Sequence, residues 1–317
     1  MKWKAPSNNH PFLFLPLTQG NPQCAQIDWV QSAAYKTPVT TEWLNIWNTP
    51  TLTSDTDICN SLIELIQPLI TLINLAQSSI DIHQKEQPHD LVTDADIGIE
   101  LLIRLWFSKH LPSHILIGEE TTKAPLSTEV PIWYLDPIDG TTNFIHGYPQ
   151  YCISLACVVN EQTQHAVIID PTRREEFSAS KGKGAELNGE RIRVSKRNGL
   201  KDSLIGNTSH VNATQNYNFE NIATFRALYK HDLTIRRSGC SALDLAYVAA
   251  GRLDGFWANG LGVWDVAAGM LIAEEAGALT SDFQGNPDYT KSDHYLCATP
   301  KCFKPMLEAI KPNFSAN

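Results

Sequence analysis

The sequence has no closely paired cysteines. The seven cysteines are scattered singly along the chain, at positions 24, 59, 152, 157, 240, 297 and 302. An odd number of isolated cysteines is typical of reduced thiols rather than of a disulfide framework. We therefore expect a protein of the cytoplasm.

Long hydrophobic runs are absent as well. The most apolar stretch, residues 62–80, contains Glu64 and Gln67, whose side chains would be costly to place in hydrocarbon. The first twenty residues carry two lysines and a short apolar run, but Pro16 interrupts that run and no small-residue cleavage site follows it. We expect neither a membrane span nor a signal peptide.

The sequence also lacks an excess of positive charge. Lysine and arginine number 25 against 34 aspartates and glutamates, so the formal charge is 25 − 34 = −9. Such a field repels nucleic acid and anionic membranes, and we expect neither as a partner. A small anionic substrate would need positive charge at its binding site, which bound divalent cations can supply.

The chain is long enough for one large domain or two closely joined halves. It has 317 residues, of which 43% are hydrophobic, and it contains no internal repeats. Residues 1–53 hold six of the 18 prolines and four of the eight tryptophans. We interpret them as an atypical extension that packs on the body of the protein or on a partner, followed by an N-terminal half at 54–195 and a C-terminal half at 196–317.

Hydrophobic periodicity alternates between the helical and the strand pattern. The apolar spacing predicts helices at 55–80 with a kink at Pro68, 95–110, 241–250 and 265–276. Short β-type runs predict strands at 114–117, 132–135, 151–159, 165–169, 192–194 and 255–257, of which 151–159 and 165–169 form an antiparallel pair. This alternation indicates a layered α/β architecture.

Acidic residues are concentrated where these strands and loops end. Four clusters stand out, at 90–96, 118–120, 136–139 and 264–265. Taken singly, each is more typical of a solvated turn or a helix cap than of a ligand; Asp96 and Asp265 could each cap the helix that follows.

The third cluster carries more weight than the others. Asp136 ends an apolar strand, and Asp139 follows it after a turn that Pro137 stiffens. Two carboxylates held close together repel one another unless a cation lies between them, and hard oxygen ligands suit Mg²⁺. The spacing therefore predicts a magnesium site.

A phosphate-binding element follows the third cluster directly. Gly140 permits a close approach of the backbone, and Thr141 and Thr142 would open a short helix whose free amides can bind a phosphate. Carboxylates for a metal next to amides for a phosphate indicate phosphoryl chemistry.

Two motifs resemble the signatures of the inositol monophosphatase family: DPIDGTTNF at 136–144 and WDVAAG at 264–269. Further segments resemble the family in the same order, so that the likeness covers residues 57–302; they are DLVTDAD at 90–96, IGEE at 117–120, GKGAELNGERIRVS at 182–195 and ALDLAYVAAGRLDGFW at 242–257. The resemblance implies an αβαβα sandwich of the sugar-phosphatase type, a homodimer, sensitivity to Li⁺ and hydrolysis of a phosphorylated metabolite.

Carried onto this sequence, the resemblance implies two to three Mg²⁺ ions. One would be held by Glu119, Asp136 and the backbone carbonyl of Ile138. A second would be held by Asp136, Asp139 and Asp265, and a weaker third would lie near Glu119.

The same resemblance implies the catalytic groups. Asp96 and Thr141 would orient and deprotonate the attacking water with help from Glu119, and the amides of Gly140 and Thr141 would hold the phosphate. Transfer to water would be direct and in line. Lys85 would contribute to the charge balance of the substrate site.

The sequence departs from the family at the substrate side. Relatives that hydrolyse inositol phosphates commonly carry a hydroxyl-binding glutamate where this chain has Ala258; we expect the neighbouring Asn259 to replace it only in part. A small polyol or sugar monophosphate is the expected substrate. Histidinol phosphate and 3′(2′),5′-bisphosphate nucleotides stay open, as does a non-catalytic scaffold regulator that binds a partner through residues 1–50.

Overall fold

The computed structural model describes five stretches of the chain, at residues 55–76, 82–84, 91–120, 130–209 and 217–314. The predicted extension at 1–53 and Lys85 lie outside them. No helix in these stretches is long and apolar enough to span a bilayer.

A seven-stranded sheet forms the first β layer. Its order is β3-β4-β5-β6-β7-β8-β9, with β3 and β4 parallel and every later neighbour antiparallel. The strands are β3 (Ile115–Gly118), β4 (Ile132–Asp139), β5 (Cys152–Val159), β6 (Gln162–Asp170), β7 (Glu175–Ser180), β8 (Gly184–Leu187) and β9 (Glu190–Arg191). A separate two-stranded ribbon pairs β1 (Ile82–Gln84) with β2 (Leu91–Thr93).

The predicted antiparallel pair is the β5–β6 hairpin, and its connection is tighter than the sequence indicated. Asn160 and Glu161 both have positive φ, at 50° and 60°, which matches the turn geometry that suits the twist of a hairpin. Gln162 therefore already pairs with Val159, and β6 begins before the predicted start at residue 165.

A five-stranded sheet forms the second β layer, in the order β11-β10-β12-β14-β13. Both neighbours of β10 run parallel to it, whereas β14 is antiparallel to β12 and β13. The strands are β10 (Leu204–Ser209), β11 (Thr234–Arg236), β12 (Gly255–Asn259), β13 (Leu279–Ser281) and β14 (His294–Ala298).

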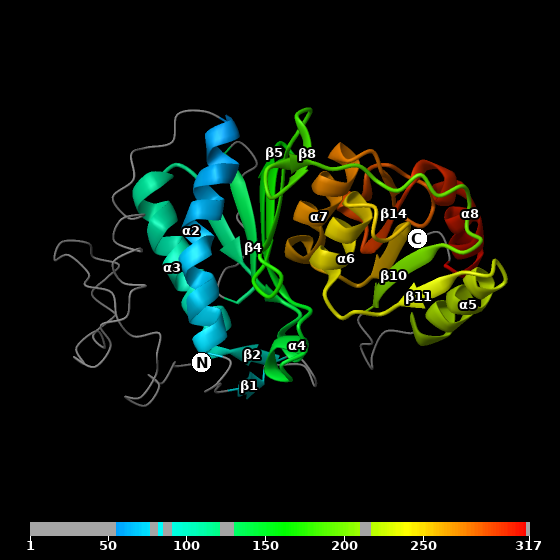
Figure 1. Cartoon of the computed structure of the whole chain (residues 1–317), viewed down its shortest axis with the longest axis horizontal. Helices are drawn as coiled ribbons and strands as arrows, with labels where there is room; N and C mark the ends of the chain where they lie inside the picture. The colour runs from blue at the N-terminus through cyan, green and yellow to red at the C-terminus, as the bar shows by residue number, and fades with distance from the viewer. Residues whose placement is uncertain (1–54, 77–81, 85–90, 121–129, 210–216, 315–317) are drawn as a thin grey trace.

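Helices cover and separate the two sheets, so that the layers run αβαβα (Figure 1). The outer pair α2 (Asp55–Ala76) and α3 (Asp94–His110) covers the seven-stranded sheet. The pair α6 (Ser241–Ala249) and α7 (Val263–Glu275) lies between the sheets, and α5 (Tyr217–Tyr229) and α8 (Pro300–Ile310) cover the far side. The predicted layered sandwich is confirmed.

Three hydrophobic cores fill the sandwich: one under α2 and α3, one around the middle helices and shared by both sheets, and one under α5 and α8. The helix sequences fit these layers. The middle helix α7 is buried continuously from Asp265 to Ala273, as expected for a helix with a sheet on each side. The outer helix α8 buries only Cys302, Met306 and Ile310, which are spaced four residues apart on one face.

The predicted helices are present with small shifts at their ends. The first continues through Pro68 to Ala76, and its predicted last residues, 77–80, lie outside the described stretches. The strand predicted at 132–135 extends to Asp139, whereas the strand predicted at 192–194 is absent because β9 ends at Arg191. The sequence did not predict β10, α5, β14 or α8. The sheets occupy residues 115–191 and 204–298, and the division of the chain at residue 195 stays a prediction.

Candidate active site

Two parallel strands and the middle layer bring the predicted carboxylates together. Gly118 of β3 is in register with Leu135 of β4, and the next amide, of Glu119, donates to the Leu135 carbonyl at 3.1 Å. Glu119 therefore follows β3 beside Asp136. Carboxylate oxygens of Glu119, Asp136 and Asp265 lie within 4.8 Å of one another.

Asp265 reaches this cluster from the first turn of α7. Its Oδ2 accepts a hydrogen bond of 2.7 Å from the backbone N–H of Gly262, so it also caps the helix. The Ser154 hydroxyl of β5 donates to the Trp264 carbonyl at 3.2 Å and ties this turn to the seven-stranded sheet. The helix-cap interpretation and the ligand interpretation are thus compatible for this residue.

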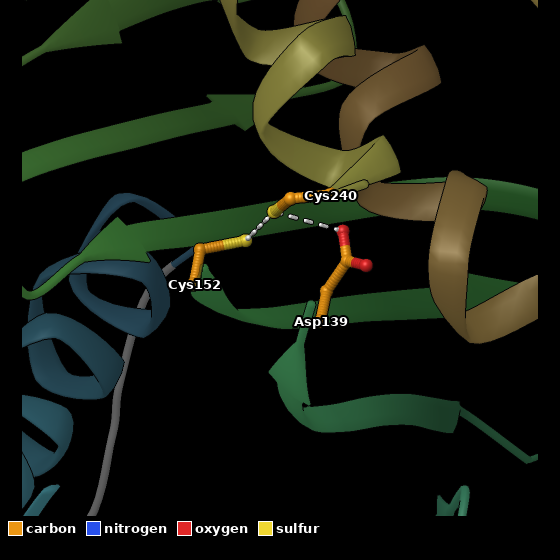
Figure 2. A group of neighbouring side chains, drawn as sticks. All are labelled: Asp139, Cys152 and Cys240. Atoms are coloured by element: carbon orange, nitrogen blue, oxygen red, sulfur yellow. Dashed lines mark hydrogen bonds between the residues drawn. The ribbon is translucent and has the colours of Figure 1, made fainter. Parts of the chain in front are cut away.

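Asp139 is held by the start of the other middle helix. One of its oxygens accepts from the Ala242 N–H at 2.6 Å and from the Cys240 thiol at 3.2 Å (Figure 2). The ladder between β4 and β5 is irregular between Asp136 and Asp139, and the N–H of Ile138 in this irregular stretch donates to Asp136 Oδ1 at 3.0 Å.

The electrostatics of the cluster oppose full ionisation. Burial, followed by the charges of Glu119, Asp139 and Asp265, raises the pKa of Asp136 well above its usual value. Burial and the same kind of repulsion raise the pKa of Asp265 well above its usual value. Burial raises the pKa of Asp139 to about 6 although the Ala242 amide lowers it. A divalent cation would relieve this repulsion.

The donor set fits a hard divalent ion. Glu119, Asp136 and Asp265 offer only carboxylate oxygens, which are the ligands that Mg²⁺ prefers. The Ile138 carbonyl, the predicted backbone ligand, accepts a hydrogen bond of 3.0 Å from the Thr141 hydroxyl. Metal-binding and phosphate-binding predictions therefore fall on adjoining groups.

The predicted phosphate element lies directly after β4. Gly140 precedes α4 (Thr141–Ile145) with φ of 93°, and a Cβ there would lie 2.9 Å from the Gln150 carbonyl, so only glycine fits. Thr141 and Thr142 occupy the first turn of α4, where amides point out of the helix. Thr142 is exposed and Thr141 half-buried.

Asp96 caps α3 and is almost completely buried. Its Oδ2 accepts from the Thr93 N–H at 2.8 Å and from the Thr93 hydroxyl at 2.5 Å, and the Thr93 hydroxyl accepts from the Asp96 amide in return. Strand β2, which ends at Thr93, packs near α4, so the elements that carry Asp96 and Thr141 are neighbours. A hydrogen bond between Asp96 and Thr141 stays a prediction.

The substrate-side residue Ala258 lies in β12. Its methyl group is fully buried in the core around α6 and α7, together with Phe256, whereas Trp257 packs in the core on the far side of the sheet. Because side chains alternate along a strand, Asn259 shares the face of Trp257. Asn259 therefore cannot replace a hydroxyl acceptor at position 258, which corrects the expectation from sequence.

Two residues that support the Glu119 loop were not predicted from the sequence. The buried Glu100 of α3 accepts from Arg104 at 2.7 Å and from the Glu120 N–H at 3.2 Å, while Arg104 also donates to the Leu116 carbonyl at 3.0 Å. A Cβ on Gly118 would lie 2.1 Å from the Glu100 carboxyl carbon, so a larger residue there would displace the Glu100 carboxylate. The i,i+4 spacing of Glu100 and Arg104 was visible in the sequence, but the contact with the loop was not.

The fold and the site together define a layered α/β protein with a buried carboxylate centre next to a short helix start. The sequence model of the inositol monophosphatase family matches residues 47–312. The chain belongs to the inositol monophosphatase family.

Three similar proteins place the chain within that family. The Nus factor SuhB of Pseudomonas aeruginosa is 44% identical over 74% of this chain and 87% of its own length. The extragenic suppressor protein suhB of Bartonella henselae, a crystal structure, is 30% identical with a TM-score of 0.75 and covers 81% of this chain and 100% of its own. The IMPase of Thermotoga maritima is 30% identical with a TM-score of 0.74 and covers 81% and 98%.

Proposed function

We propose that this protein is a Mg²⁺-dependent phosphomonoesterase that hydrolyses a small polyol or sugar monophosphate. The observation that carries the proposal is the convergence of Glu119, Asp136 and Asp265, with Asp139 adjoining them and the start of α4 next to it. A bound divalent cation would offset the repulsion among these buried carboxylates and so give the cluster a function.

Glu119, Asp136, Asp139 and Asp265, with the Ile138 carbonyl, would hold the metal ions, two to three in number. When bound, Mg²⁺ supplies positive charge that offsets the charge of the phosphoryl oxygens and eases the deprotonation of water. The carboxylates hold this charge in a fixed place next to the Gly140–Thr141 backbone.

The chain's own groups would orient the reactants. Amides of Gly140, Thr141 and Thr142 would bind the phosphate at the start of α4. Thr141 and Asp96 would orient the attacking water and accept its proton, with Glu119 assisting. The phosphoryl group would then pass directly to water, and no residue would become phosphorylated.

The residues of the site support a class of reaction but do not support one particular substrate. Ala258 offers a buried methyl group where a hydroxyl acceptor would discriminate between polyols, so we do not propose a strict preference for inositol phosphates. One similar structure bears the name IMPase, which favours a sugar-like or polyol monophosphate over histidinol phosphate or bisphosphate nucleotides. We also propose a cytoplasmic homodimer that Li⁺ inhibits.

A phosphate-release assay tests the proposal. Purified protein is given a panel of polyol, sugar and nucleotide monophosphates with and without Mg²⁺, beside the variants Asp136→Asn and Asp202→Asn. We expect Mg²⁺-dependent release that Asp136→Asn lowers by about a thousandfold. The exposed Asp202 lies in a turn that tolerates asparagine, so its variant should keep full activity. If no compound of the panel yields phosphate, the proposal is wrong.

A second candidate function is that of a regulator that binds a protein partner. The observation in its favour is that the relative 44% identical to this chain is named a Nus factor. Affinity capture from cell extract with wild type and Asp136→Asn separates the two candidates. A regulator needs no intact carboxylate centre, so the variant should capture the same partner as wild type if this function is correct.

A further inference from the structure

A second group of possible ligands lies against Asp139, outside the oxygen cluster. Figure 2 shows the Cys240 thiol between Asp139 and Cys152. The two sulfur atoms are 3.6 Å apart, and Cys240 Sγ is 3.2 Å from Asp139 Oδ2. One ligand atom from each of the three residues lies within 4.8 Å of the others.

Three separate elements fix this group. Asp139 ends β4 and stands opposite Cys152 in the β4–β5 ladder. Cys240 immediately precedes α6, whose first-turn amide at Ala242 donates to Asp139. Each of the three side chains is more than nine-tenths buried, so packing in the protein interior fixes their arrangement.

The spacing matches what a tetrahedral zinc ion requires. With Zn–S of about 2.3 Å and Zn–O of about 2.0 Å, tetrahedral angles place two sulfur ligands about 3.8 Å apart and a sulfur and an oxygen about 3.5 Å apart. Two of the three observed separations, 3.6 Å between the sulfurs and 3.2 Å from Cys240 Sγ to Asp139 Oδ2, need shifts of only a few tenths of an ångström. The third pair, Cys152 Sγ and an Asp139 carboxylate oxygen, lies within 4.8 Å and would move closer when an ion binds.

We infer that Asp139, Cys152 and Cys240 form a binding site for a thiophilic divalent ion, Zn²⁺ above all. Binding would replace the two S–H protons, which pass to solvent, by two metal–sulfur bonds, and would leave one coordination position for water or phosphate. Mg²⁺ would not bind the two sulfur atoms, which are too soft for it, and would contend with Zn²⁺ only for the Asp139 carboxylate.

The consequence for activity rests on the proposed function. Asp139 is also a proposed Mg²⁺ ligand, and a carboxylate oxygen engaged by Zn²⁺ is withdrawn from the oxygen cluster. Zn²⁺ should therefore inhibit phosphate release through the two thiols, and a higher Mg²⁺ concentration should raise the Zn²⁺ concentration needed for half-inhibition.

Cobalt titration of the full chain under reducing conditions tests the site directly. Co²⁺ adopts zinc geometries and gives a thiolate-to-metal absorption in the near ultraviolet. We expect that absorption in wild type and its loss on addition of Zn²⁺. Cys152→Ser and Cys240→Ser should both abolish it, while Cys297→Ser, a fully buried cysteine in β14, should retain it. Absence of the absorption from folded wild type, or its persistence in both serine variants, would overturn the inference.

Two further measurements keep the outcome interpretable. If a serine variant fails to fold, alkylation mapping of wild type replaces it: Zn²⁺ should protect Cys152 and Cys240 at least tenfold but leave Cys297 unprotected, and equal protection refutes the site. In activity assays, the serine variants should need at least tenfold more Zn²⁺ for half-inhibition. A cobalt signal in a protein that hydrolyses nothing would uphold the metal site and reject the phosphatase.

Discussion

At the scale of single residues, Asp96 shows how one side chain can serve two purposes. It lies in the first turn of α3, accepts two hydrogen bonds from Thr93 and so caps the helix, which is the role that its place at the start of a helix indicated. It is also nearly inaccessible to solvent, which is unusual for a carboxylate that only caps. The cap and the proposed catalytic role predict different effects of substitution.

We expect Asp96→Asn to separate those roles. Asparagine keeps an acceptor for the Thr93 amide, so the free energy of unfolding should change by less than about 1 kcal/mol. The proton-accepting group is lost, so kcat should fall by about 10² to 10⁴. Urea unfolding and steady-state kinetics measure the two effects.

Thr93→Ala is the matched control for that comparison. It removes the capping hydroxyl, so it should cost about 1 kcal/mol of stability, with a much smaller loss of kcat. An Asp96→Asn protein with more than a tenth of the wild-type kcat would leave Asp96 as a helix cap alone.

At the scale of elements, α3 positions the loop that carries Glu119. Glu100 in this helix binds the backbone of Glu120 and pairs with Arg104, which in turn holds the Leu116 carbonyl of β3. Gly118 lets the loop pass against the Glu100 carboxylate. Glu119 is thus fixed from a helix on the outer face of the sheet.

Glu100→Gln should weaken this support without changing the size of the side chain. Arg104 loses its charged partner and the Glu120 amide loses a charged acceptor, so unfolding should become about 1 to 3 kcal/mol easier. The Mg²⁺ concentration for half-maximal activity should rise several-fold because Glu119 is less well positioned. Glu64→Gln, on an exposed part of α2, should change neither. An unaltered Mg²⁺ requirement in Glu100→Gln would limit Glu100 to a structural role.

At the scale of the whole molecule, we expect the carboxylate centre to make the free energy of unfolding depend on pH and on bound metal. The folded pKa of Asp139, about 6, is above its ordinary value of 3.8. A raised carboxyl pKa stabilises the folded state below the unfolded value, and that stabilisation is lost as the pH rises through the folded value. The metal-free protein therefore carries a penalty near neutral pH.

This penalty is tested by measuring the free energy of unfolding, by heat or urea, as a function of pH, once in chelator and once in Mg²⁺. In chelator, the stability of wild type relative to Asp139→Asn should fall between about pH 4 and about pH 7, by on the order of 3 kcal/mol. Saturating Mg²⁺ should remove the fall, because the ion stabilises the charged carboxylates. If, in chelator, the free energies of unfolding of wild type and Asp139→Asn change in parallel over this pH range, the Asp139 carboxyl group keeps its ordinary pKa.

Much of the fold was accessible from local sequence patterns. Strong periodicity predicted α2, α3, α6 and α7, and the apolar runs predicted β4, β5 and β6, because each of these elements buries one consistent face or is buried throughout. Short strands such as β11 and β13 were missed, since three residues are too few to show a period. Their position depends on pairing with strands distant in sequence.

The sequence by itself determined the family, and it identified the residues of the candidate site: the carboxylates at 119, 136, 139 and 265 and the glycine that precedes α4. Residue type and local spacing suffice for that, because ligand and turn preferences are properties of single residues and short motifs. Only the tertiary structure decided that Asn259 faces away from Ala258, that Glu100 supports the Glu119 loop, and that Cys152 meets Cys240. Those relations join residues up to 88 positions apart, as for the two cysteines, through strand register and helix docking, which local sequence patterns do not encode.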